Sequence, residues 1–246
     1  MELGNMGSGK SASMVREILS HPGRTYFSNI ITHRSVKNNH LIKPEMIFNK
    51  EPIIKADGSP VISKGEPQYK LSVNKEFWQE AVKRYGEINV IIDEAHIILN
   101  ARRSMSKKTQ VVLDWMALLR RVLGASDSRL ILVTQIERRL DIVAKEQATD
   151  MHFNIMHYCK SCPACGKTWR ETNEDPEPVR ECPKCGKKIV KHSFIVEKWH
   201  FKNYNDFIMW KYMGQRKTYY KHYLINDIEK VFPYYDTLQW ENLLVE

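Results

Sequence analysis

A short segment near the start of the sequence restricts the possible folds more than any other feature. Residues 4–11 read GNMGSGKS and match the pattern G-x-x-x-x-G-K-S at every defined position. In such a phosphate-binding loop, or P-loop, glycines let backbone N–H groups curl around phosphates, and the lysine neutralises phosphate oxygens. The serine hydroxyl binds Mg²⁺, and the helix that follows adds partial positive charge. The pattern predicts that ATP is contacted by Gly4, Asn5, Met6, Gly7, Ser8, Gly9, Lys10, Ser11 and Ala12.

Strands and helices are expected to alternate after this loop. Apolar spacing predicts helices over residues 11–19, 75–85 and 109–123, and strands over 25–31, 88–92 and 129–134. This alternation indicates an α/β fold with a mostly parallel sheet. Residues 35–71 are polar and carry a hairpin signal at Asp57-Gly58, so we expect them to leave the core.

The segment before the P-loop is unusually short for a strand. A P-loop follows a strand, and strands commonly have about five residues, yet only three residues precede Gly4. Either the chain starts further upstream, or the first strand is missing or replaced.

Polar residues follow two of the buried strands. Residues 88–94 read INVIIDE, which is the form of a Walker B segment. We expect Asp93 to bind Mg²⁺ together with Ser11, and Glu94 to act as the base for the attacking water. Gln135 follows the strand over 129–134 and is placed to orient that water or to sense the γ-phosphate. The candidate catalytic residues are thus Lys10, Glu94 and Gln135; the alternatives are a helix N-cap for the two carboxylates and a strand-end cap for the glutamine.

Two C-P-x-C-G knuckles predict a zinc ribbon. They contain Cys162, Cys165, Cys182 and Cys185. Four thiolates satisfy tetrahedral Zn²⁺ with no open position, so the site should be structural. A redox C-x-x-C pair is the alternative for each knuckle, and Cys159 is an alternative ligand. Residues 152–158 and 193–201 both read as strands, which places the knuckles at the far end of a β-hairpin.

Composition limits the compartment and the partners. The net charge of +9 favours association with polyanions. The longest mainly apolar stretch, residues 90–99, contains three ionisable residues and falls far short of a membrane helix. Neither a signal pattern nor a dispersed cysteine framework is seen, so we expect a reducing cytoplasm.

Several segments, in this order and spacing, resemble the Zot-like branch of the FtsK/HerA superfamily of P-loop ATPases. The resemblance covers about residues 3–158. It is carried by the P-loop, Ser28-Asn29-Ile30, Asp93-Glu94-Ala95-His96 with Arg102-Arg103, Leu118-Leu119-Arg120-Arg121, and Val133-Thr134-Gln135 with Leu140-Asp141.

The resemblance implies a RecA-like (ASCE) core, ATP hydrolysis by Glu94, and a ring of subunits, with a hexamer favoured, acting on double-stranded DNA. The superfamily includes filamentous-phage assembly ATPases, DNA pumps and archaeal viral genome-packaging ATPases. This chain differs from the phage assembly proteins in lacking a membrane span and in adding a zinc ribbon. A DNA-translocating or packaging motor in the host cytoplasm, or associated with a virion, therefore fits better than virion extrusion.

Basic residues cluster after the Walker B strand. Lys107 and Lys108 are the candidates for DNA contact. The candidates for an arginine finger that reaches a neighbouring subunit's nucleotide are Arg120, Arg121, Arg138 and Arg139. A solvated helix face is the alternative reading of the basic residues.

The sequence divides into a P-loop ATPase core (1–158), a zinc-ribbon insert (159–192), and a return strand with an aromatic-rich end (193–246). Two functions compete with a DNA motor. One is an ATPase that drives phage or virion assembly, or secretion, through a protein partner such as a viral structural protein. The other is a non-hydrolysing zinc-ribbon adaptor with a relic P-loop.

Overall fold

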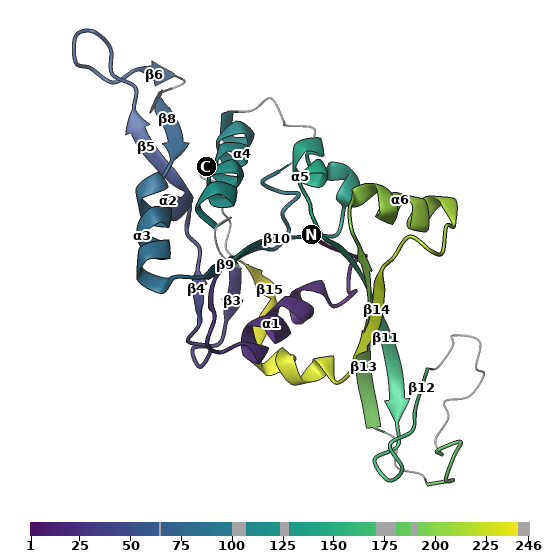
Figure 1. Cartoon of the computed structure of the whole chain (residues 1–246). Helices are drawn as coiled ribbons and strands as arrows, with labels where there is room; N and C mark the ends of the chain where they lie inside the picture. The colour runs from purple at the N-terminus through teal and green to yellow at the C-terminus, as the bar shows by residue number, and fades with distance from the viewer. Residues whose placement is uncertain (64, 100–106, 124–127, 171–180, 188–190, 241–246) are drawn as a thin grey trace.

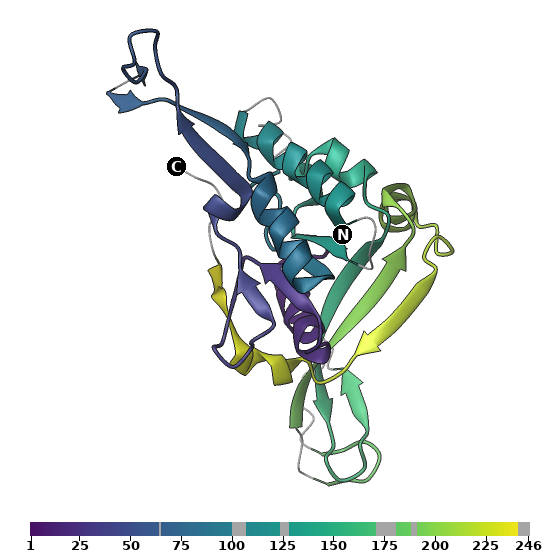
Figure 2. The ribbon, with the colours of Figure 1, turned by 60° about the vertical axis from the view of Figure 1, so that its left-hand side comes forward.

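The computed structural model places eight strands side by side in one sheet with helices on both faces (Figures 1 and 2). It describes residues 1–246 except 64, 100–106, 124–127, 171–180, 188–190 and 241–246. In spatial order the strands are β14 (Lys221–Ile225), β13 (Lys191–Phe201), β11 (Met151–Ser161), β1 (Glu2–Leu3), β10 (Arg129–Thr134), β9 (Ile88–Ile92), β2 (Thr25–Ser28) and β4 (Asn39–Leu41).

The strands from β4 to β11 run parallel, and β13 and β14 are added antiparallel. The two-residue β1 lies between β10 and β11, with Glu2 opposite Val133 and Leu3 opposite Phe153. The strand before the P-loop is therefore present and central, although it is short. A mostly parallel sheet with the P-loop after a central strand confirms the expected RecA-like P-loop fold.

Helices cover both faces of this sheet (Figure 1). Their bounds are α1 (Lys10–Ser20), α2 (Pro44–Ile47), α3 (Lys75–Tyr85), α4 (Lys107–Leu123), α5 (Ile142–Glu146) and α6 (Tyr204–Met213), with the 3₁₀ segments η2 (Glu137–Arg139) and η3 (Ile228–Tyr234). The three expected helices are confirmed as α1, α3 and α4. For α3 the sequence signal is local: the Asn74 side chain accepts a hydrogen bond from the Phe77 N–H at 3.1 Å, and Gly86 ends the helix.

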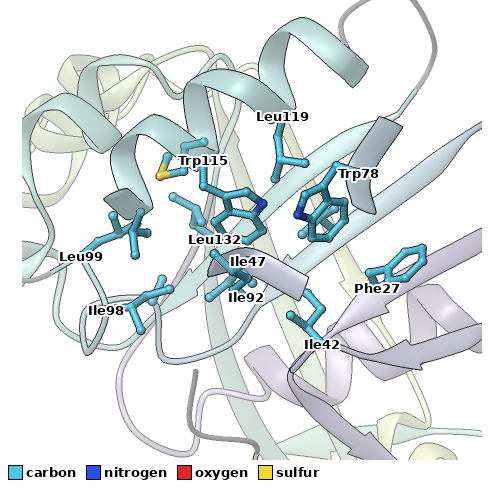
Figure 3. Packing of buried hydrophobic residues seen from close by; sticks show 14 of the residues in the cluster. Phe27, Ile42, Ile47, Trp78, Ile92, Ile98, Leu99, Trp115, Leu119 and Leu132 are labelled. Atoms are coloured by element: carbon cyan, nitrogen blue, oxygen red, sulfur yellow. The ribbon is translucent and has the colours of Figure 1, made fainter. Parts of the chain in front are cut away.

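The largest core cluster packs α3 and α4 onto the sheet. Trp78 and Trp115 are fully buried, with ring centroids 5.5 Å apart. Figure 3 shows these rings beside Ile92 of β9 and Leu132 of β10. Burying each large apolar side chain contributes about 1.5–3 kcal/mol, so this cluster holds the Walker B strand in place. A second cluster packs α1 and η3 against the sheet.

The expected strand over residues 25–31 is instead two strands. It breaks at Asn29, between β2 and β3 (Ile30–Thr32), and β3 pairs with β15 (Tyr235–Trp240) away from the main sheet. The Ile30 N–H turns to the Ser28 hydroxyl at 3.2 Å instead of continuing the ladder. The polar side chains at this point thus compete with strand pairing.

The expected excursion over residues 35–71 is wrong for its first part, because β4 lies in the main sheet and Ile42 and Ile47 are buried in the core. Only the strands that follow form an arm that projects from the core (Figure 1). Its strands are β5 (Phe48–Pro52), β6 (Ile62–Ser63), β7 (Glu66–Pro67) and β8 (Tyr69–Val73), of which β5 pairs with β8 and β6 with β7. The turn expected at Asp57-Gly58 is confirmed, because the Lys55 N–H bonds to the Ser59 carbonyl at 2.8 Å.

The long β11–β13 hairpin reaches away from the core and carries the cysteine knuckles at its far end, where β12 (Thr168–Arg170) pairs with β11 (Figure 1). At its base, the aromatic residues Phe201, Phe207 and Trp210 pack together, with ring centroids 5.2–5.6 Å apart. These three rings thus belong to a hydrophobic cluster at the base of the hairpin. Across the described ranges, the structure contains no helix long and apolar enough to cross a membrane.

Candidate nucleotide-binding site

Three neighbouring parallel strands deliver the candidate residues to one edge of the sheet. Gly4 follows β1, Asp93 follows β9 and Gln135 follows β10, and β10 lies between the other two strands. Parallel strands end at the same edge, so residues far apart in the sequence meet there.

The glycines of the P-loop are required by its backbone and by its neighbours. Gly7 and Gly9 have φ angles of 70° and 76°, a region that other residues rarely adopt. A Cβ atom on Gly9 would also lie only 2.6 Å from Val196 Cγ2 of β13. Strand β13 therefore forms the wall behind the loop, which the sequence pattern did not predict.

Lys10 is held at the centre of the loop. Its ammonium donates to the carbonyls of Gly4 at 3.0 Å and Asn5 at 2.9 Å, and lies 3.4 Å from Ser8 Oγ. Burial lowers the pKa of Lys10, and the carboxylates of Glu94 and Asp93 partly oppose this shift. A buried cation held only by neutral oxygens in direct contact fits an anionic phosphate.

Ser11 and Asp93 meet as the magnesium assignment requires. Ser11 Oγ donates a hydrogen bond to Asp93 Oδ2 at 2.5 Å. Burial raises the pKa of Asp93, and the Ser11 hydrogen bond offsets part of that rise. Hard oxygen ligands at a buried carboxylate fit Mg²⁺, which would supply the missing positive charge.

Asn29 lies in the site, although sequence patterns assigned it no role beyond its place in the Ser28-Asn29-Ile30 segment of the family resemblance. Its amide donates to the Asp93 carbonyl at 2.9 Å, and its oxygen accepts from the Asp93 N–H at 2.6 Å. Asn29 is buried and so holds the backbone of Asp93 from the adjacent strand end. The signal available in the sequence was a polar residue directly after an apolar strand.

Glu94 lies between Gln135 and His96. The Gln135 amide donates to Glu94 Oε1, while Glu94 Oε2 lies 3.2 Å from His96 Nδ1 without a hydrogen bond among the described groups. Glu94 has a φ of 51°, and such strained residues cluster at functional sites. One carboxylate oxygen thus accepts a hydrogen bond, whereas the other is buried and accepts none from the described groups.

His96 was also missed as a site residue. Its Nδ1 lies 3.0 Å from Thr134 Oγ1, at the end of β10. Burial lowers the pKa of His96, and the positive charge of Arg139 lowers it further, so the ring is neutral near pH 7.

The match to a family model decides which family this sequence represents. The model described as zonular occludens toxin (Zot) matches residues 1–158, a span that includes the P-loop, Asp93, Glu94 and Gln135. This chain belongs to the Zot family. The resemblance drawn from the order of the motifs is confirmed.

Two solved structures are similar to this chain at low sequence identity. The N-terminal domain of zonular occludens toxin from Neisseria meningitidis is 16% identical, with 96% of this chain and 97% of that chain covered and a TM-score of 0.45. The genome packaging NTPase B204 from Sulfolobus turreted icosahedral virus 2, in complex with ATP-gammaS, is 19% identical, with coverage of 62% and 72% and a TM-score of 0.34. No curated protein matches the sequence.

The arginine-finger candidates of this Zot-family chain lie at opposite edges of the sheet. Arg138 and Arg139 are in η2, directly after the Gln135 end of β10, and the Arg138 guanidinium lies 5.4 Å from the Tyr212 ring centroid. Arg120 lines a cavity at the other edge, near the end of α4 that also carries Arg121. Lys107 and Lys108 begin α4, but their side chains lie outside the described part of the chain, as do Arg102 and Arg103.

The four knuckle cysteines come together at the tip of the hairpin, with all four sulfur atoms within 4.8 Å of one another. Cys162 Sγ lies 3.6 Å from Cys185 Sγ, and Cys165 Sγ lies 3.5 Å from Cys182 Sγ. Gly166 and Gly186 have φ angles of 69° and 67°, and their N–H groups close each turn onto the cysteine carbonyl four residues earlier. This geometry fits tetrahedral Zn²⁺.

Backbone N–H groups favour the thiolate form of Cys182. Burial raises the pKa of the Cys182 thiol, but the backbone hydrogen bonds from Lys184 and Cys185 outweigh it and lower the pKa to about 6. Thiolates are the ligands that zinc binds. The side chain of Cys159, the alternative ligand, lies outside the described residues.

Proposed function

We propose that this Zot-family chain is an ATP-hydrolysing motor of the FtsK/HerA type that translocates or packages DNA. The observation that carries the proposal is the meeting of Lys10, Ser11 and Asp93 with the Glu94–Gln135 pair at one edge of the sheet. A P-loop alone binds phosphate, whereas the added carboxylate pair supplies a metal ligand and a base.

Each residue has a role that follows from its contacts. Lys10 would exchange the loop carbonyls for phosphate oxygens, and Ser11 and Asp93 would hold Mg²⁺. The ion, when bound, neutralises charge on the β- and γ-phosphates. Glu94 Oε2 would accept the proton of the attacking water, while Gln135 holds the other oxygen of the same carboxylate.

The charge of the chain supports DNA as the polymer that is moved. The net charge of +9 attracts a polyanion such as DNA. We propose Lys107 and Lys108 as DNA contacts and a hexameric ring as the working assembly.

The test is the steady-state ATPase rate at low salt, with and without double-stranded DNA. A motor predicts that DNA raises the turnover of the wild type, that salt weakens this rise, and that Glu94→Gln abolishes it. An ATPase rate that DNA does not change, but that a viral structural protein raises, would favour the assembly ATPase instead. If no ATP hydrolysis is measured under any of these conditions, the non-hydrolysing zinc-ribbon adaptor would be the remaining function.

A further inference from the structure

A second polar cluster lies at the edge of the sheet opposite the nucleotide site, where the proposed function uses none of its residues. It surrounds the start of β1 and β11 and the end of β13, and it faces a cavity of about 740 Å³. The cavity is lined by Glu2, Asp150, His152, Lys198 and His200, among other residues.

His152 connects two carboxylates. Its Nδ1 lies 2.9 Å from Glu2 Oε2, and its Nε2 lies 2.8 Å from Asp150 Oδ2. Glu2 is fully buried and ion-paired with Lys198 at 2.8 Å, so it stays ionised and accepts a hydrogen bond from the Nδ1–H of His152. This orients Nε2 toward Asp150 and the cavity.

His200 has a nitrogen that the surrounding protein does not satisfy. Its ring lies against that of His152, with centroids 3.9 Å apart, and the side chain is buried. Its Nε2 has no hydrogen-bond partner among the described residues. Burial, with a contribution from the positive charge of Lys198, lowers the pKa of His200 to about 4, so the imidazole is neutral at pH 7. A buried neutral imidazole with an unused nitrogen fits a metal ligand.

We propose that Asp150, His152 and His200 bind a divalent transition-metal ion of the Zn²⁺ type. Their ligand atoms lie within 4.8 Å of one another, and a tetrahedral zinc site requires separations of about 3.4 Å, so ion binding would draw the three side chains closer together. Two imidazoles and one carboxylate are a donor set that suits zinc and related ions.

The side chains that contact His152 and Asp150 are of the kind that orient metal ligands. Glu2 accepts the remaining N–H of His152, the carboxylate–histidine arrangement that orients metal ligands. The Tyr220 hydroxyl donates to Asp150 Oδ1 at 2.8 Å, which leaves Oδ2 for the ion. Three protein ligands beside a cavity leave a fourth position for water, unlike the closed site of the four cysteines.

The alternative is that no ion binds and a proton bridges His152 and Asp150. Counting bound metal separates the two. Purified full-length chain is saturated with Co²⁺, freed of excess ion, and analysed for cobalt and for its absorption spectrum. We expect two Co²⁺ per chain, of which only one gives the intense thiolate-to-metal absorption of the cysteine site.

The decisive variant is His200→Ala, because the contacts of His152 with Glu2 and Asp150 remain. It should retain the thiolate absorption and lose the second Co²⁺, with affinity at that site at least 10-fold weaker. His222→Ala is the matched control, since His222 stacks on Trp199 and lies outside the cluster. The converse variant, Cys162→Ser with Cys182→Ser, should lose the thiolate absorption and retain one Co²⁺. A wild type that binds one Co²⁺, or a His200→Ala chain that retains two, would overturn the proposal.

Discussion

Ser11 Oγ donates a hydrogen bond to Asp93 Oδ2 at 2.5 Å and thereby joins the P-loop to the end of β9, 82 residues further along the chain. This contact brings the two proposed Mg²⁺ ligands together. The roles proposed for Lys10, Glu94 and Gln135 depend on this contact, because a nucleotide bound at the P-loop must also lie close to the carboxylates of Asp93 and Glu94.

Lys10→Ala and Glu94→Gln should separate binding from hydrolysis. Lys10 is the cation inside the loop, so its removal should abolish ATP binding. Glu94→Gln removes the base but retains a side chain of the same shape, so ATP should still bind while turnover falls by about 10²–10⁴-fold. Nucleotide-binding titrations and ATPase rates measure the two effects, with exposed Glu80→Gln as the control. Wild-type turnover in Glu94→Gln would refute the base assignment.

Asn29→Ala should weaken both stability and the response to Mg²⁺. The variant leaves the Asp93 N–H and carbonyl without their partners, at a cost of about 1–3 kcal/mol in the free energy of unfolding. Because Asp93 is less well positioned, half-maximal ATPase activity should need more Mg²⁺.

The matched control for this prediction is Asn203→Ala. Asn203 caps α6 by accepting from the Asp206 N–H, so its loss should cost about 1 kcal/mol without changing the Mg²⁺ requirement. Urea unfolding and Mg²⁺ titration test both variants. Equal Mg²⁺ curves for the two would mean that Asn29 is only structural.

Gly9→Ala should abolish nucleotide binding, because the added methyl group would collide with β13 behind the loop. The new Cβ would lie 2.6 Å from Val196 Cγ2, and the φ of 76° disfavours alanine. Adding Val196→Ala removes the steric clash but not the backbone strain, so ATP binding should return in part. A Gly9→Ala chain with unchanged ATP affinity would show that the loop does not depend on this wall.

Cys182→Ser should remove the zinc of the ribbon and spare the core. Closed four-cysteine sites contribute folding energy, so the hairpin tip should unfold locally while the main thermal transition remains. Zinc content should fall by one equivalent per chain. Cys159→Ser is the control and should leave the zinc content unchanged; if it lowered it, Cys159 would be a ligand.

ATP hydrolysis should require assembly. No candidate arginine touches the P-loop in the described structure, and a finger supplied in trans adds about 10³–10⁵ in rate. Specific activity should therefore rise with protein concentration.

A mixing experiment identifies the finger. Lys10→Ala chains keep it, so combining them with chains mutated at Arg120, Arg121, Arg138 or Arg139 in turn should restore some turnover only where the true finger was removed. Specific activity that stays constant down to concentrations where only monomer is present would mean that one chain holds a complete site.

Local sequence was sufficient for the parts of the fold that local physics specifies. The P-loop glycines and Lys10 specify the backbone conformation of the loop. Asn74 begins α3 and Gly86 ends it, and the apolar run before Asp93 has the pattern of a buried strand. The two cysteine knuckles likewise carry their own turn geometry, so only a hairpin was needed to bring their four sulfur atoms together.

The tertiary structure alone decided which of these parts meet. The placement of β10 between β1 and β9 brings Gln135 to Glu94, and the return of β13 sets Val196 behind Gly9. Such contacts follow from strand order and register, which no local pattern encodes. For the same reason the sequence could not show that Glu2 in β1 would meet His152, 150 residues later, in a cluster at the far edge of the sheet.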